Sequence, residues 1–79
     1  KTLEKQTISI SINKDIHFYI NENRVEESNL EKEIIEIVQA EEEPAIILHA
    51  DKSVDIEHVV KVMDIAYRNK YKIVLATKP

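Results

Sequence analysis

The sequence has 79 residues, of which 43% are hydrophobic and 33% are charged, the composition of one small globular domain. Its net charge is -4 and its Lys and Arg residues are scattered, which argues against a nucleic-acid-binding surface or a patch for anionic membranes. The lack of cysteine excludes disulfides and thiol catalysis, and the lack of glycine excludes phosphate-binding glycine loops. No apolar run is long enough to cross a bilayer.

The first part of the chain predicts a linker followed by a β-hairpin. Residues 1–6 are mostly polar or charged and are expected to be a linker remnant. Apolar and polar residues alternate over 7–12, which is the period of a half-buried strand. Turn-forming residues at 13–15 and a second alternating run over 16–20 complete an antiparallel hairpin. Residues 21–24 are expected to form a second turn.

A helix is predicted from Ser28 to about Ala40. Ser28 is a candidate N-cap, and Glu31 lies three residues later. At this spacing the side chain of each residue can accept a hydrogen bond from the backbone amide of the other. The acidic run 41–43 and Pro44 end the helix, because the residue before a proline is pushed out of the α conformation. The apolar side chains that recur at helical spacing are Leu30, Ile34, Ile37 and Val38.

The stretch 45–64 predicts a strand, a turn and a helix, around which the rest of the fold is organised. Residues 45–50 are apolar on both faces, which suits a strand between two neighbours. In the turn at 51–55, Asp51 is expected to accept hydrogen bonds from backbone amides. The buried stripe predicted for the helix consists of Ile56, Val59, Val60, Met63, Ala66 and Tyr67.

The last part of the chain predicts the end of this helix and a final strand. Asn69 is expected to end the helix in the left-handed conformation, and residues 71–76 form the strand. The element order is then β-β-α-β-α-β. A right-handed crossover makes the later strands parallel, so we expect an α/β fold of two layers, with both helices on one face of a mixed sheet. One domain over 7–79 accounts for all of these elements.

Three segments of the chain resemble the periplasmic domain of the ExbD/TolR family. They read Ala-Asp-Lys-Ser-Val-Asp at 50–55, Lys-Val-Met-Asp at 61–64 and Lys-Ile-Val-Leu at 72–75. In that family a strand ends in an Ala-Asp-Lys-x-Val turn, a helix carries Val-Met-Asp and a last strand reads Lys-Ile-Gly-Leu, so Val74 replaces a common glycine. The resemblance covers nearly the whole chain. It implies that the motif positions are structural or face a partner, and these positions are Asp51, Lys52, Val54, Val62, Met63, Asp64 and Leu75.

The resemblance implies a partner-binding and coupling module in the periplasm, part of a proton-motive-force-driven complex of the bacterial inner membrane that energises outer-membrane transport. It implies a TonB-like partner, a homodimer, and an ExbB-like subunit that is contacted through a transmembrane helix outside this chain. The proton-carrying aspartate of the family would lie on that helix. The alternative within the family is a TolR-like subunit that binds peptidoglycan, although the three segments favour ExbD.

Read without the resemblance, the residues offer no catalytic centre, cofactor site or metal site. Asp51 and Lys52 are adjacent in a turn with nothing to orient a third group, so we do not expect an enzyme. The histidines His17, His49 and His58 lack metal-ligand spacing and are expected to be surface residues. An unrelated small α/β ligand-binding domain stays open as an alternative, because fold does not fix function.

The remaining candidate site is an edge of the sheet. An edge strand has unpaired backbone groups and can bind an extended peptide or a second copy of the chain. The sequence does not decide whether the first or the last strand is the free edge. The candidate partner-binding residues are Ile8, Ile10 and Ile12 on the first strand, and Ile73 and Leu75 on the last.

Overall fold

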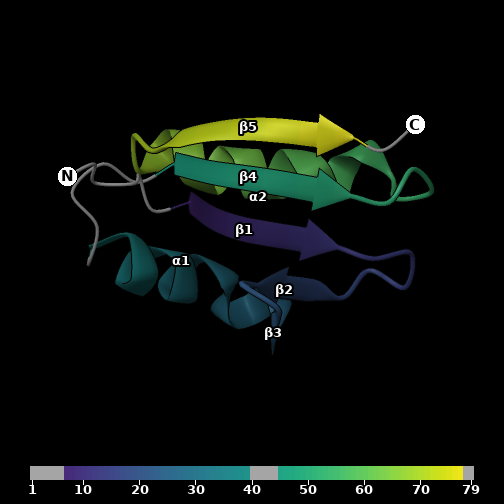
Figure 1. The fold of residues 1–79 in the computed structure, drawn as a ribbon, viewed down its shortest axis with the longest axis horizontal. Coiled ribbons are helices and arrows are strands. Elements are labelled where there is room, and N and C mark those ends of the chain that lie inside the picture. The colour runs from purple at the N-terminus through teal and green to yellow at the C-terminus, as the bar shows by residue number, and fades with distance from the viewer. Residues whose placement is uncertain (1–6, 40–44, 78–79) are drawn as a thin grey trace, which may run out of the picture.

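The fold is a five-stranded sheet with two helices packed on one face (Figure 1). The computed structural model describes residues 7–39 and 45–77, so the predicted linker at 1–6 and the acidic run at 41–43 lie outside the described residues. The strands are β1 (Thr7–Ile12), β2 (Phe18–Ile20), β3 (Asn23–Val25), β4 (Ala45–Ala50) and β5 (Lys72–Thr77). The helices are η1, a 3-10 turn (Glu27–Asn29), α1 (Leu30–Gln39) and α2 (Ile56–Arg68). The predicted fold class is confirmed.

The strands are arranged in the order β3-β2-β1-β4-β5. β1 pairs with β2 in antiparallel and with β4 in parallel orientation, and β4 pairs in parallel with β5. The sheet is therefore mixed, as predicted. The expectation that β1 could be a free edge is wrong, because β1 has a paired strand on each side and its residues Ile8, Ile10 and Ile12 are at most 2% exposed.

The core lies between the sheet and the helices. Alternate residues of β1 and β4 point into it, and the fully buried Ile10 and Leu48 are direct partners across the two strands. Buried residues of both helices belong to the same cluster, so both helices cover the same face of the sheet. The stripe predicted for α1 is confirmed, since Leu30, Ile34 and Val38 are buried and Ile37 packs against them.

The hairpin differs from the prediction in both its turns. Ile16 has a positive φ of 61° and lies in the first turn, so β2 begins only at Phe18. The predicted turn at 21–24 is in fact a two-residue turn, with φ of 48° at Asn21 and 74° at Glu22. Two successive left-handed residues close a tight hairpin, which leaves Asn23 free to start a third strand that the sequence did not reveal.

Neither predicted helix cap forms as expected. Ser28 lies inside the 3-10 turn, and the carboxylate of Glu31 contacts α2 instead of capping its own helix. At the end of α2, Asn69 has a φ of -100°, and the left-handed residue is Lys70, with a φ of 60°. The Asn69 side chain instead donates a hydrogen bond of 2.7 Å to the carbonyl oxygen of Ile65, which supplies the missing cap.

The buried stripe predicted for α2 is wrong in half of its members. Ile56, Val60 and Tyr67 are 69%, 54% and 66% exposed. The residues that α2 buries are Val59, Val62, Ile65 and Ala66, with Met63 partly buried beside them. A helix that lies on one face of a sheet can bury only one arc of its surface, and α2 carries apolar residues over a wider arc than that.

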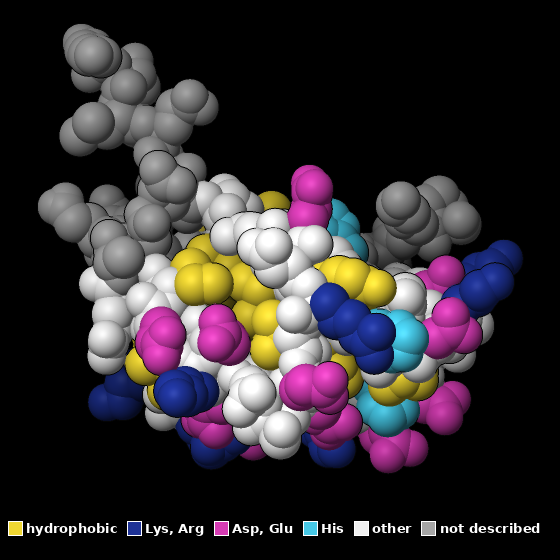
Figure 2. All heavy atoms as spheres, turned by 90° about the horizontal axis from the view of Figure 1, so that it is seen from below, with side chains coloured by type: hydrophobic (Ala, Val, Ile, Leu, Met, Phe, Trp, Pro, Cys, Tyr) yellow, Lys and Arg dark blue, Asp and Glu magenta, His cyan; other side chains and the backbone are white. Residues whose placement is uncertain are grey.

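Charged side chains of both signs are interspersed on the side of the molecule where α1 and β3 lie (Figure 2). Lys and Arg side chains on this side alternate with Asp and Glu instead of forming one basic patch. This distribution fits the mixed charge pattern of the sequence, in which 11 basic residues accompany 15 acidic ones.

Candidate functional site

The free edge of the sheet is β5, since this strand pairs only with β4. Its six residues read Lys-Ile-Val-Leu-Ala-Thr and contain no acidic side chain. Of the predicted edge residues, Ile73 is partly buried against the core, and Leu75 is 38% exposed. The opposite edge, β3, has only three residues, and its Asn23 and Arg24 are exposed and polar. β5 is thus the longer and more apolar of the two edges.

An exposed apolar surface lies beside this edge. All five large apolar side chains that are exposed in the described part of the chain belong to two elements, α2 and β5. They are Ile56, Val60 and Tyr67 on α2 and Val74 and Leu75 on β5. Val74 pairs with Ile47 and so points to the face of the sheet that the helices do not cover, whereas Leu75 pairs with the buried Leu48 and points to the helix side. We call the four residues on the helix side, Ile56, Val60, Tyr67 and Leu75, the α2–β5 surface. Exposed apolar side chains gathered in one region, rather than scattered singly, mark a surface for binding another molecule.

The turn between β4 and α2 is held by Asp51, as predicted. Its Oδ1 accepts hydrogen bonds from the backbone amide of Ser53 at 3.0 Å and from the Ser53 hydroxyl at 2.7 Å. These two hydrogen bonds, with help from the nearby ammonium groups of Lys14 and Lys52, hold the pKa of Asp51 below its ordinary value. Val54 packs against the core, and Lys52 is exposed. The Asp-Lys-x-Val segment therefore fixes the conformation of the turn that leads from β4 into α2.

We expect the carboxyl group of Asp51 to titrate below the ordinary aspartate value of 3.8. Ser53→Ala removes the hydroxyl donor and should move the midpoint upward, whereas Ser53→Thr keeps a donor and should preserve it. Because the folded pKa is depressed, this turn stabilises the fold fully above about pH 4, and the contribution is lost as the pH falls through the folded pKa. NMR titration of the carboxyl carbon measures the midpoint, and an unchanged value in Ser53→Ala would contradict this role.

The Val-Met-Asp segment of α2 has three different environments. Val62 is fully buried and Met63 is partly buried against the core. Asp64 is exposed, and its carboxylate accepts a hydrogen bond of 2.9 Å from Nε of Arg68, one helical turn later. None of the three belongs to the α2–β5 surface: Val62 and Met63 pack against the core, and Asp64 lies on the exposed side of α2.

Ion pairs join η1 and α1 to α2 on the side away from β5. Arg68 donates to both carboxylate oxygens of Glu31, at 3.0 and 3.3 Å, and Lys61 pairs with Glu27. Hydrogen bonds to Asp64 and Glu31 raise the pKa of Arg68, and the hydrogen bond to Glu27 raises the pKa of Lys61. All these groups are exposed, so the pairs orient the two helices but contribute little stability.

Two hollows lie near these contacts, and the carboxylates around them already accept hydrogen bonds. One, of about 290 Å³, lies under the ion pairs on a floor of Phe18, Leu30 and Ile65, and the charged side chains around it already pair with one another. The other, of about 210 Å³, lies at the ends of β1 and β4 near Asn13 and Asp51. The Oδ1 atoms of these two residues accept backbone amides of their own turns.

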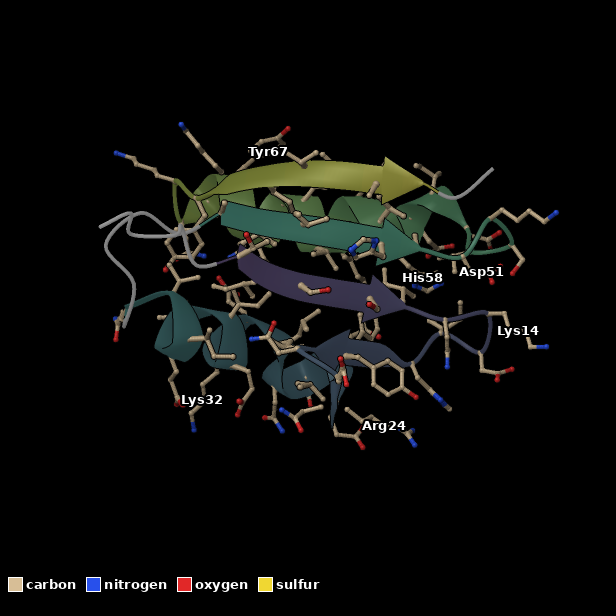
Figure 3. The ribbon with its side chains drawn as sticks, viewed as in Figure 1. Lys14, Arg24, Lys32, Asp51, His58 and Tyr67 are labelled. Atoms are coloured by element: carbon tan, nitrogen blue, oxygen red, sulfur yellow. The ribbon has the colours of Figure 1, made fainter. Side chains whose placement is uncertain are left out.

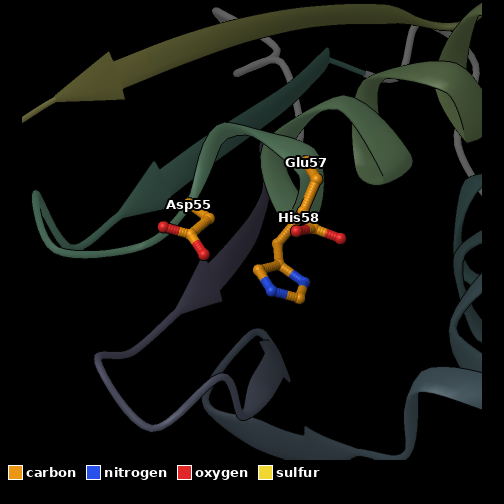
Figure 4. A group of neighbouring side chains, drawn as sticks. All are labelled: Asp55, Glu57 and His58. Carbon is orange, nitrogen blue, oxygen red and sulfur yellow. The ribbon is translucent and has the colours of Figure 1, made fainter.

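Three side chains meet at the start of α2: Asp55, Glu57 and His58 (Figure 4). Their potential ligand atoms lie within 4.8 Å of one another, and Nδ1 of His58 is buried without a hydrogen-bond partner in the described part of the chain. Both carboxylates are exposed and lie at the amino end of a helix, where negative charge complements the helix dipole. The same dipole opposes a bound cation. His17 and His49 lie outside this group.

The comparisons with known proteins identify the family of the chain. No helix among the residues that the structure describes is both long enough and apolar enough to span a membrane. The family model described as biopolymer transport protein ExbD/TolR matches residues 1–79, which is the whole sequence. A search of curated proteins found no match. With the match over the full sequence and the family's three segments in the β4–α2 turn, on α2 and on β5, the chain belongs to the ExbD/TolR family.

Proposed function

We propose that this chain is the periplasmic domain of an ExbD-like subunit of a proton-motive-force-driven complex in the inner membrane. Its role is to bind a partner and couple it to the complex during outer-membrane transport, without a catalytic centre. Membership of the biopolymer transport family supports this role. The observation that carries the proposal is the free edge of β5 with exposed apolar side chains beside it.

Strand addition is the binding mode that this edge favours. A strand with one neighbour leaves a row of backbone N–H and C=O groups unpaired, and an extended peptide satisfies them by becoming the next strand. β5 offers six residues for such pairing, about 20 Å of strand. β3 offers only three and lacks exposed apolar side chains. A TonB-like protein would therefore bind at β5, through an extended periplasmic segment.

The other partners in this proposal use different parts of the protein. An ExbB-like subunit would be contacted through a membrane-spanning helix, which is not among the described residues. A second copy of the chain would also find an unpaired edge in β5, so homodimer formation and peptide binding have to be separated by experiment. Both interactions are compatible with a module that holds partners and carries out no reaction.

An NMR titration tests the proposal. The isotope-labelled protein is mixed first with the periplasmic segment of a TonB-like protein and then, in a separate sample, with purified peptidoglycan. We expect the TonB-like segment to shift amide signals of 72–77 and of α2. Shifts produced by peptidoglycan alone would favour the TolR-like role, which the same family model covers. No shift with either partner would contradict a binding function.

Leu75→Lys should abolish binding of the TonB-like segment. Leu75 is 38% exposed, so the lysine head group can reach water in the free protein, but an added strand would force the charge out of water. Asn23→Lys places the same charge on β3, the opposite edge, and should leave binding unchanged. Isothermal titration calorimetry measures both variants, and thermal unfolding confirms that each is folded. Equal affinities for the two would contradict binding at β5.

A further inference from the structure

The exposed apolar residues of α2 form a row on one side of the helix. Ile56, Val60 and Tyr67 have the spacing i, i+4, i+11 and lie about 110° around the helix from Lys61 and Arg68, at 3.6 residues per turn. Lys61 and Arg68 pair with residues of η1 and α1, which fixes the side of α2 that faces α1. The apolar row therefore lies on the side toward the free edge. Tyr67 is seen there beyond β5, far from Lys32 on α1 (Figure 3).

β5 presents its apolar side chains to the same region. Ile73 and Leu75 pair with the buried residues Ile46 and Leu48 of β4, so they point to the face of the sheet that the helices cover. Side chains of a strand alternate between the two faces. A strand added outside β5 would thus place every second side chain on the helix side, next to Leu75 and against the apolar row of α2.

Two exposed lysines lie at the amino end of β5. Lys70 and Lys72 are both exposed, one just before the strand and the other at its first residue. The strand itself carries no acidic residue that could neutralise them. A ligand strand with acidic side chains at the matching end would therefore be favoured by charge as well as by apolar contact.

We propose that the α2–β5 surface takes an extended peptide in which apolar and polar residues alternate, with the apolar side chains against α2 and acidic residues opposite Lys70 and Lys72. The inference rests on the proposed strand addition at β5 and adds the chemistry of the added segment. Antiparallel pairing is slightly more stable per residue than parallel pairing. The acidic residues are therefore at the carboxyl end of the peptide, which lies beside the amino end of β5.

Three synthetic octapeptides of identical composition test this chemistry. The first alternates threonine and valine over six residues and ends in two aspartates. The second carries the two aspartates at its amino end, and the third groups its three valines together. Fluorescence anisotropy gives the affinities for the full chain, and NMR amide shifts locate the binding. We expect the first peptide to bind at least about tenfold more tightly than the other two.

Variants of α2 separate recognition by the helix from strand addition itself. Val60→Ser and Tyr67→Ser should each weaken binding of the first peptide by about tenfold, because both side chains are more than half exposed in the free protein and would be covered in the complex. Glu57→Ser removes an exposed side chain from another side of α2 and should leave the affinity unchanged. The exposed positions of all three leave the core intact.

The outcomes distinguish this inference from the function on which it rests. Equal affinities for all three peptides, with shifts on β5 but no effect of the α2 variants, would leave strand addition standing and overturn the proposed chemistry. Tighter binding of the second peptide would overturn the antiparallel orientation. No shift on β5 with any peptide would overturn both proposals. Shifts of the α2 and β5 signals that depend on protein concentration alone would assign the surface to a second copy instead.

Discussion

Replacing Ile65 with alanine is expected to lower the free energy of unfolding by about 3 kcal/mol, because it opens a cavity in a packed core. Ile65 is only 8% exposed and belongs to the core cluster between the sheet and the helices. Ile56 lies on the same helix but is 69% exposed, so Ile56→Ala should change the free energy by no more than about 0.5 kcal/mol. Urea unfolding followed by circular dichroism measures both values.

The pair of isoleucine variants decides which side of α2 packs on the sheet. Both substitutions remove the same atoms from the same helix, so differences in helix propensity largely cancel. For a chain of 79 residues, a loss of about 3 kcal/mol is a large part of the total stability. Similar losses for the two variants, or a larger loss for Ile56→Ala, would mean that the helix is rotated toward the orientation predicted from the sequence.

Glycine at two positions is expected to stabilise the protein by about 1.5 kcal/mol in total. Glu22 and Lys70 have positive φ values of 74° and 60°, which cost a residue with a Cβ atom roughly 1–2 kcal/mol each, part of which is offset by the greater freedom of unfolded glycine. The double variant Glu22→Gly with Lys70→Gly should raise Tm by roughly 6–10 °C. Differential scanning calorimetry gives the change.

The control for this prediction is a turn residue without a positive φ. Lys52→Gly lies in an exposed turn and is not among the left-handed residues, so it should lower stability by about 0.5 kcal/mol. A gain in this control equal to that of the double variant would mean that the benefit does not come from the left-handed conformation. The sequence contains no glycine at all, which makes these two sites unusually informative.

The sheet and its covering helices could be predicted from periodicity. The alternation over Thr7–Ile12 and the apolar run Ala45–Ala50 specify strands because each buries at least one face, and the spacing of Leu30, Ile34 and Val38 specifies the buried side of α1. β3 was missed because a strand of three mostly exposed residues carries no apolar alternation. Its existence depends on the turn at Asn21, whose geometry the sequence does not display.

The candidate site could be predicted only in part. The sequence limited the binding surface to two strands, and Ile73 and Leu75 of β5 do lie on the free edge. The exposure of Ile56, Val60 and Tyr67 on α2 could not be predicted, because their spacing is that of a buried stripe. The sequence does contain a sign of this exposure, because Val62 and Ile65 are apolar as well and lie on another side of α2. With them, the apolar arc of α2 is wider than one sheet can cover, so some of it has to be exposed.

Amide hydrogen exchange of β5 tests most directly the claim that this strand binds a partner by strand addition. The protein is measured alone and with the periplasmic segment of a TonB-like protein. Strand addition predicts that alternate amides within Lys72–Thr77, those that point away from β4, become protected only in the complex. Unchanged exchange along β5, or protection confined to β3 or to the residues around the hollow under the ion pairs, would contradict the claim.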